Sequence, residues 1–344
     1  MEVRLMKGKI NKAAFRSLTV LIAVAMVAVF AGSVYAKPVK IRFSHVVSPN
    51  TPKGQAADMF AKMANERLKG KVEVQVFPNS QLYTDKKVLD ALSTGSVEMA
   101  APSTAKFTSW VPQLQLFDLP FLFKNSNVLY QTIDGKAGKK LFKLLAKKNM
   151  LGLAMWDNGF KQIGNNLREI KKPSDAGGVK YRIMSSKVLE AQFKAVGGNP
   201  LVMPFSEVYS ALEQGVIDGQ ENTWSNMYSK KFYEVQKYIT GTDHGYLGYM
   251  VVTNAQFWNH LPKDVRTELE AILKEVTAWI RVNALKINMA QKAKIVASGV
   301  TTVTDLTETE KDAFREAFKP VHNEFRDVIG GDLIDAVYEL NAKN

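Results

Sequence analysis

The sequence predicts an α/β fold of two similar lobes braced by one long helix. Strand-like and helical segments alternate in both halves of the chain, which favours a parallel or mixed sheet with helices on its faces. Residues 88–98 and 208–218 share a pattern of helix, glycine and strand. Chance, or the order of elements common to α/β folds, explains this similarity as well as duplication does. A helical pattern without internal Gly or Pro then runs from Pro262 to Gly299.

The first half of the chain predicts three strands and two helices in alternation. The strands are predicted at 40–46, 72–77 and 97–101, and the helices at 51–69 and 84–92. Thr51 is a favourable N-cap and Pro52 fits the first helical turn. Gly70 and Gly95 end the two helices.

The second half repeats this order, with strands predicted at 151–157, 179–183, 216–221 and 301–303, and helices at 186–196, 205–214 and from Thr307 onward. The helix after Pro262 would be about 50 Å long, which exceeds one small domain and suits a brace. Two helices with a break near Asn288 are the alternative. We expect lobe I to hold 37–158 and about 248–285, and lobe II to hold 159–247 and about 286–344.

Residues 1–36 have the features of a cleaved signal peptide. Basic residues precede the apolar stretch 18–31, and small residues lead to Ala36, after which we expect cleavage. The apolar stretch is short for a membrane span, so an uncleaved anchor is the less favoured alternative. The sequence therefore predicts an exported protein.

Composition excludes several function classes. The 344 residues contain no cysteine, which removes disulfides, thiol catalysis and cysteine metal sites. Residues 1–36 hold five basic residues and one acid, so the formal charge of +13 leaves +9 on residues 37–344. The lysines occur as pairs spread along the chain and do not form the continuous basic surface typical of nucleic-acid-binding proteins. A net positive charge favours the binding of small anionic ligands.

Catalytic motifs are missing from the sequence. The four histidines form no metal-type cluster, and there is no Gly-x-Ser-x-Gly elbow, Walker loop or dinucleotide fingerprint. Asp218 and Glu221 would point to opposite faces of a strand, which makes a poor hydrolytic pair. We therefore expect binding without catalysis, and no metal or cofactor.

Candidate binding residues follow the carboxyl ends of the predicted strands, where ligands bind in open α/β sheets. Arg182 ends one strand, and Ser186 opens the next helix, so a planar cation lies beside free backbone N–H groups that suit a carboxylate. The other candidates at such ends are His45, Lys53, Ser103, Asn158, Lys161 and Asn222. Together they predict a cleft for a ligand with two negative ends.

Five segments carry a family resemblance: Trp156–Lys161, Lys180–Ile183, Phe205–Leu212, Val216–Asn222 and His244–Tyr249. They resemble the substrate-binding proteins of TRAP transporters, and most of all the C4-dicarboxylate-binding branch often called DctP. The resemblance covers essentially all of residues 38–342, in order.

The resemblance implies a Gram-negative periplasmic protein of the two-lobed, type II-like binding-protein fold. It would close around its ligand as a monomer and deliver it to the small and large subunits of a sodium-driven membrane permease. The family's carboxylate-binding arginine falls on Arg182 and its assisting asparagine on Asn222. Many relatives have a second arginine where this chain has Lys161, which argues against sialic acid and suits a compact diacid.

The expected ligands are succinate, fumarate and malate. One carboxylate would pair with Arg182 and Asn222, and the other would meet Lys161, Lys53 or both, with Ser103 assisting. An aromatic, keto or sugar acid in the same cleft is the alternative, with Trp110, Phe160 or Trp224 as a stacking wall. An exported hydrolase or lyase, and an additional sensor role, remain open on sequence alone.

Overall fold

The computed structural model describes residues 37–146 and 148–344, so the predicted signal peptide lies outside the described residues. Residues 39–344 form one compact unit. Across the described part of the chain, every helix is too short or too polar to span a bilayer.

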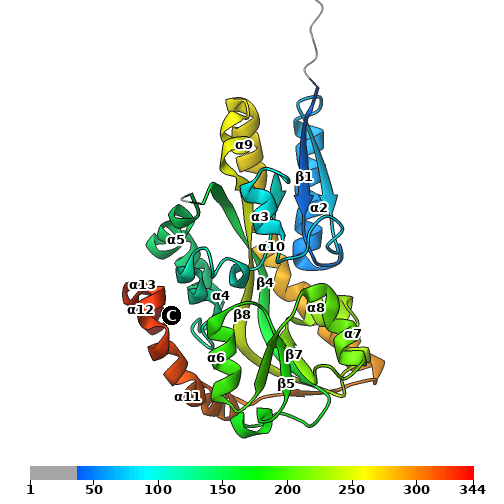
Figure 1. Cartoon of the computed structure of the whole chain (residues 1–344), viewed down its shortest axis with the longest axis vertical. Coiled ribbons are helices and arrows are strands. Elements are labelled where there is room, and N and C mark those ends of the chain that lie inside the picture. The colour runs from blue at the N-terminus through cyan, green and yellow to red at the C-terminus, as the bar shows by residue number, and fades with distance from the viewer. Residues whose placement is uncertain (1–36, 147) are drawn as a thin grey trace, which may run out of the picture. The chain divides into compact units, whose positions relative to one another are not determined.

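Nine strands of the described residues form one mixed sheet (Figure 1) in the order β2-β1-β3-β8-β4-β7-β5-β6, with β9 paired to β8. The strands are β1 Val39–Ser44, β2 Val72–Phe77, β3 Met99–Ala100, β4 Met150–Asn165, β5 Lys180–Ile183, β6 Asn199–Val202, β7 Gly219–Asn222, β8 Tyr238–Asn254 and β9 Thr302–Asp305. The predicted class, a mixed α/β sheet with one long helix, is confirmed.

The two longest strands, β4 and β8, pair antiparallel and run through the middle of the sheet. At one end β8 pairs with β3, and at the other end β8 pairs with β9 while β4 pairs with β7. The pairing of β4 with β8 has three irregularities, one of them between Asp157 and Gly159. Gly159 has a φ of +103° there, and its N–H donates to Asp157 Oδ1 over 2.8 Å. Such bulges bend a strand and re-aim its side chains.

Helices cover both faces of the sheet. The α-helices are α2 Pro52–Arg67, α3 Val88–Ser93, α4 Ser126–Asp134, α5 Lys136–Ala146, α6 Lys187–Ala195, α7 Val208–Glu213, α8 Trp224–Ser229, α9 Ala255–His260, α10 Lys263–Ser298, α11 Glu308–Glu324, α12 Arg326–Ile329 and α13 Gly331–Lys343. The 3₁₀ turns are η1 Thr104–Lys106, η2 Pro112–Asp118, η3 Pro173–Ala176, η4 Phe205–Glu207 and η5 Phe232–Glu234.

Two apolar clusters lie on opposite faces, because alternate residues of β8 belong to different clusters. Leu247 and Tyr249 belong to the cluster with α2, α6, α7, α8 and α10. Tyr246 and Met250 belong to the cluster with α3, η2, α4, α5, α12 and α13. The sheet is therefore buried on both sides.

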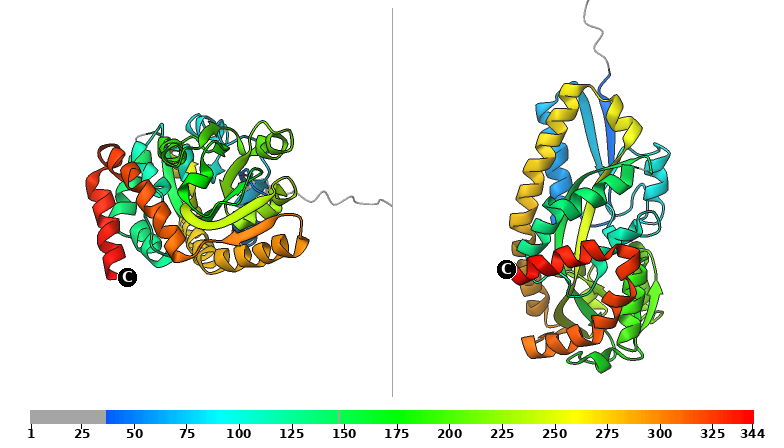
Figure 2. Two further views of the ribbon diagram at one scale, coloured as in Figure 1. Left: turned by 90° about the horizontal axis from the view of Figure 1, so that it is seen from below. Right: turned by 90° about the vertical axis from the view of Figure 1, so that its left-hand side faces the viewer.

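Helix α10 is continuous over 36 residues and ends at Gly299, whose φ of +65° suits a left-handed cap. Asn288 does not break it. The buried Asn288 amide donates to Asn158 O (2.9 Å) and accepts from Ser225 N (2.9 Å), so it joins α10 to β4 and α8. Figure 2 shows α10 beside α2, which it also contacts. The predicted long helix is confirmed, and it packs along both ends of the sheet.

Several predicted elements differ in extent. Strand β4 continues to Asn165 rather than ending at Asp157, because residues 157–159 form a bulge and not a turn. Strand β8, in which apolar residues face both clusters, has no counterpart in the prediction. Helix α3 begins at Val88 rather than Thr84, and β7 begins at Gly219 rather than Val216. The remaining predicted elements are present within a few residues of their expected limits.

We expect Asn288→Ala to lower the free energy of unfolding by roughly 2–4 kcal/mol, because it leaves buried backbone groups of β4 and α8 without partners. Urea denaturation measures this loss. Asn283→Ala is the matched control, since Asn283 lies on the same helix and bonds only to Trp279 O. Equal stability of the two variants would contradict the role assigned to Asn288.

Candidate functional site

A small cavity lies where β4, β5, β7 and β8 approach the loops after β1 and β3. Its empty space measures about 340 Å³ when the open solvent at its mouth is counted, and little of that space is enclosed. Its lining residues are Val46, Val47, Asp85, Ser103, Lys161, Arg182, Met184, Phe205, Glu221, Asn222, Asn226, Leu247 and Tyr249. Four of the predicted binding residues are thus brought together here: Arg182, Asn222, Lys161 and Ser103.

Arg182 is held rigidly in β5, between β6 and β7. Its side chain is 2% exposed, and Nε donates to Met203 O over 2.9 Å. Nη2 is buried without a partner. Burial lowers the pKa of Arg182 to about 10, so it stays protonated at neutral pH. A buried cation with an unused donor is costly unless an anion meets it, and its planar fork matches a carboxylate.

Asn222 lies at the end of β7 and offers further donors. Its Oδ1 accepts from Asn226 Nδ2 over 2.7 Å, which directs the Asn222 N–H₂ group away from this bond. Asn226 Nδ2 also donates to the Tyr249 hydroxyl over 3.2 Å. Asn226 and Tyr249 therefore orient Asn222, and Arg182 and Asn222 together present N–H donors to the cavity.

Lys161 is already paired. Its ammonium donates to Glu221 Oε1 over 2.6 Å, and both side chains are at most 2% exposed. Glu221 Oε2 accepts from Gln192 (3.2 Å) and lies 2.8 Å from His244 Nε2. Gly245 leaves room for this pair, because a Cβ at that position would lie 2.8 Å from Lys161 Cε. Lys161 lines the cavity, but Glu221 compensates its charge.

The protonation states of this cluster follow from its contacts. Although burial opposes ionisation, Lys161 and His244 lower the pKa of Glu221 to about 2, so it is a carboxylate. Burial lowers the pKa of His244, which is therefore neutral at pH 7. Its Nε2–H donates to Glu221, and the Thr242 hydroxyl donates to Nδ1 over 2.7 Å. One negative and one positive charge remain in the cluster, and they cancel.

Lys53 and His45 lie behind the cavity wall rather than on it. Lys53 Nζ donates to Ala101 O over 2.9 Å and sits 3.4 Å from the centre of the Tyr249 ring. Burial lowers the pKa of Lys53 to about 7. Both ring nitrogens of His45 are buried without a partner, and burial together with Lys53 lowers the His45 pKa to about 3. Lys53 therefore contacts the electron-rich face of Tyr249, a residue that lines the cavity.

Asn158 and Ser186 are also absent from the cavity lining. The Asn158 side chain donates to Thr223 Oγ1 over 2.7 Å, at the junction with α10. Ser186 is buried beside Asp118, close enough to lower the Asp118 pKa, although neither side chain has a hydrogen-bonding partner within 3.5 Å. Burial is the stronger influence and raises the pKa of Asp118 to about 7.

The structure adds residues that the sequence did not single out. Asp85, Phe205, Asn226 and Tyr249 line the cavity, and the buried Lys106 lies in η1, just after Ser103. Asn226 follows Asn222 by four residues, a spacing at which two side chains on one helix would be neighbours. The others come from distant segments, and nothing in their local sequence indicates a shared site.

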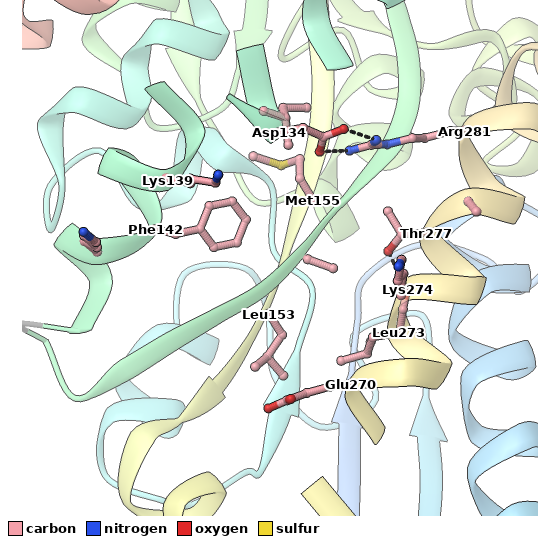
Figure 3. Close-up of a pocket in the computed structure, with 14 residues that line it drawn as sticks. Asp134, Lys139, Phe142, Leu153, Met155, Glu270, Leu273, Lys274, Thr277 and Arg281 are labelled. Atoms are coloured by element: carbon pink, nitrogen blue, oxygen red, sulfur yellow. Dashed lines mark hydrogen bonds and ion pairs between the residues drawn. The ribbon is translucent and has the colours of Figure 1, made fainter. Parts of the chain in front are cut away.

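A larger and more open hollow lies between α4, α5, β4 and α10 (Figure 3). It measures about 1450 Å³ including the solvent at its mouth. Arg281 at its edge is paired with Asp134 through two bonds of 2.7 and 2.8 Å, and Lys139, Lys143 and Lys274 are exposed to solvent. The smaller cavity, with its buried and unpaired donors, is the stronger candidate. In residues 37–146 and 148–344, no group of three His, Asp or Glu side chains is placed to hold a metal ion.

Comparison with known proteins gives a consistent result. Residues 43–327 match the family model of bacterial extracellular solute-binding protein, family 7. The chain is 47% identical over 309 residues to the C4-dicarboxylate-binding periplasmic protein DctP of Rhodobacter capsulatus, covering 90% of this chain and 92% of the relative.

Two solved structures have the same fold. A TRAP periplasmic solute-binding protein from Sulfurospirillum deleyianum, with bound succinate, is 49% identical with a TM-score of 0.86, covering 89% of this chain and all of that one. A second, from Pseudomonas aeruginosa with bound L-malate, is 42% identical with a TM-score of 0.81, covering 83% and 100%.

The buried pair gives a stability prediction. Lys161→Met should lower the free energy of unfolding by about 3–5 kcal/mol, because Glu221 loses its cation inside the protein. The double variant Lys161→Met/Glu221→Gln should recover most of that loss. Urea denaturation provides the measurement. Lys187→Met is the control, since its exposed pair with Glu190 is worth at most about 1 kcal/mol. A double variant no more stable than the single one would refute the pairing.

Proposed function

This chain belongs to bacterial extracellular solute-binding protein family 7, the DctP family of TRAP solute-binding proteins, and we propose that it captures C4-dicarboxylates such as succinate, fumarate and malate. Arg182 is the observation that carries the proposal. Its buried guanidinium is fixed by Met203 O and keeps an unpartnered Nη2 beside the donors of Asn222. A carboxylate is the planar acceptor that satisfies these groups.

The charge balance around the cavity favours a dianion. Lys161 and Glu221 cancel. Arg182, Lys53 and Lys106 are the other buried cations of the described chain, and the lining residue Asp85 compensates one of them. The pKa values of Lys53 and Asp118 are both about 7, so each group is partly protonated at neutral pH. The cavity therefore keeps an excess of positive charge, which a ligand with two carboxylates would balance.

We infer that binding is coupled to hinge closure of two lobes, with the limits expected from the sequence: 37–158 and about 248–285, and 159–247 and about 286–344. Two contacts support this division. Ser103 Oγ lies 3.1 Å from Met184 Sδ, and Thr108 Oγ1 donates to Ser185 O over 2.9 Å. Both connect the segment after β3 with the segment after β5. Opening would break them, and β4 and β8 would act as the crossing strands.

We propose export by cleavage after Ala36, a monomeric periplasmic protein, and delivery of the ligand to the small and large subunits of a TRAP permease. Relatives of the family are periplasmic binding proteins, and binding without chemical turnover fits a site built of donors and compensated charges.

A larger aromatic, keto or sugar acid is less well supported. Trp110, Phe160 and Trp224, the predicted stacking residues, do not line the cavity. Phe205 and Tyr249 are its aromatic lining residues, and Tyr249 is covered on one side by Lys53. The excess positive charge around the cavity favours a diacid.

Replacement of Arg182 tests the proposal directly. We expect Arg182→Ala to weaken succinate binding by two or more orders of magnitude, because one carboxylate loses its buried cation, at about 3–5 kcal/mol. Isothermal titration calorimetry measures the affinity. Arg315→Ala is the control, since Arg315 is exposed and paired with Asp312 and Glu308. Butyrate should bind the unchanged protein much more weakly than succinate. Near-normal succinate affinity in Arg182→Ala would contradict the assignment of Arg182 as a carboxylate-binding residue.

Succinate affinity should also depend on pH. The pKa values of Lys53 and Asp118 are both about 7, so between about pH 6 and about pH 8 Lys53 loses a positive charge and Asp118 gains a negative one. A bound dianion favours the protonated form of each group, so the complex holds more protons than the free protein. Affinity should therefore fall roughly 3- to 30-fold over this range.

Calorimetry in buffers of different ionisation enthalpy measures the proton uptake. Asp118→Asn should flatten the pH profile, whereas Asp312→Asn, on exposed α11, should leave it unchanged. Proton release on binding, or an affinity independent of pH, would contradict this coupling.

A further inference from the structure

We propose that Lys106 is the cation that binds the second carboxylate of the ligand. This inference rests on the proposed capture of a C4-dicarboxylate. It assigns to η1, a short turn after β3, the half of the site opposite Arg182.

Most of the buried cations in the described chain already have a partner. Within residues 37–146 and 148–344, four cationic side chains are buried: Lys53, Lys106, Lys161 and Arg182. Lys161 is held by Glu221, and Lys53 is held by Ala101 O and the Tyr249 ring. Arg182 is committed to the first carboxylate.

Lys106 alone among these four has no side-chain hydrogen bond or ion pair with the described residues, although the residue is only 8% exposed. Unlike Nη2 of Arg182, its Nζ is not among the fully buried polar atoms that lack a partner, so the ammonium keeps some access to solvent and to a ligand. A buried lysine that the protein leaves unpaired is therefore a candidate for pairing with a ligand anion.

Lys106 lies next to the cavity, although it is not one of the residues that line it. It follows the lining residue Ser103 by three positions, and its backbone N–H donates to Ser103 O over 2.9 Å. Burial lowers the pKa of Lys106, and the charges of Asp85, Arg182 and Asp118 act on it as well. Two of these three groups, Asp85 and Arg182, line the cavity. The Lys106 ammonium therefore lies in the same electrostatic neighbourhood as the guanidinium that holds the first carboxylate.

The acidic side chains near Lys106 are not paired with it. No ion pair within 4.0 Å joins Lys106 to Asp118 or Asp85 in the described chain, so neither acid occupies its donors. Glu221, the other acid of the cavity, is fully engaged by Lys161, Gln192 and His244. Lys161 is thus paired with Glu221, whereas Lys106 remains available to a ligand. On this assignment Lys161, which was expected to meet the second carboxylate and which lines the cavity, pairs with Glu221 instead.

The test compares a diacid with a monoacid in matched variants. Succinate and butyrate are titrated into the whole mature protein, into Lys106→Met and into Lys230→Met. Lys230 is the control, because its ammonium lies 5.7 Å from the ring of Phe205, a cavity residue, yet it is bonded to Asn79 Oδ1. Its removal deletes the same charge from the same neighbourhood.

Lys106→Met should weaken succinate binding roughly 10- to 100-fold while leaving butyrate binding within about 2-fold, since only the second carboxylate loses a charge-assisted bond. Lys230→Met should change either affinity by less than about 3-fold. If Lys106→Met lowers both affinities equally, or lowers neither, the assignment of Lys106 is overturned. If the unchanged protein does not bind any C4-dicarboxylate, the proposed function itself fails, and that result is separate from the first.

Lys106→Arg and Lys106→Gln keep the test decisive if the methionine variant folds poorly. The arginine variant should retain part of the preference for succinate over butyrate, and the glutamine variant should lose most of it. Thermal unfolding of each variant without ligand reports on folding independently. Retention of the full preference by Lys106→Gln would overturn the assignment.

Discussion

The ion pair between Lys161 and Glu221 is the interaction on which the site depends. It places two opposite charges inside the sheet, on the neighbouring strands β4 and β7, and His244 of β8 completes the bonding of Glu221. Such a pair is tolerated only when each charge is well matched, because the cost of desolvation is otherwise several kcal/mol per ion. Gly245 makes room for it. Since both oxygens of Glu221 bond elsewhere, it makes no ion pair with Arg182, and Nη2 of Arg182 remains available to an anion.

Local signals predicted much of the fold. Thr51 caps its helix as expected, Thr307 caps α11, and Gly299 ends α10 in a left-handed conformation. Several elements had no counterpart in the prediction, among them α4, α5, β6, α8 and α9. The largest differences concern β4 and β8, which are long, irregular and buried on both faces. Polar and glycine residues in β4 resemble a turn in sequence, but they form a bulge whose unpaired groups are satisfied by Asp157 and by Asn288 of α10. That compensation comes from residues far away in the chain, so local periodicity does not reveal it.

The site residues also differ in whether local sequence signals identify them or whether they depend on distant partners. Arg182 and Asn222 lie at strand ends, where the sheet rule and the family resemblance both point, and the structure places them together in one cavity. Lys161 also lies on a strand, and its type suggested a free cation. Whether a lysine is free depends on its partner, and Glu221 is 60 residues away along the chain. The same limitation hid Lys106, because its value for the site comes from lacking a partner in the folded protein, a property that no sequence pattern records.

These charges suggest how a small buried site distinguishes a diacid from a monoacid. In water, an exposed lysine adds little to affinity, because the solvent screens it. Inside the protein, an uncompensated charge is costly, and a ligand that neutralises it recovers that cost, whereas a ligand with one carboxylate leaves one cation unmatched. The Lys161–Glu221 pair adds no net charge to the cavity, so the other buried cations determine its excess positive charge. A second free arginine in place of Lys161 would change that balance unless Glu221 held it in the same way. Selectivity in this protein is therefore a property of the whole buried charge cluster, including residues that never touch the ligand.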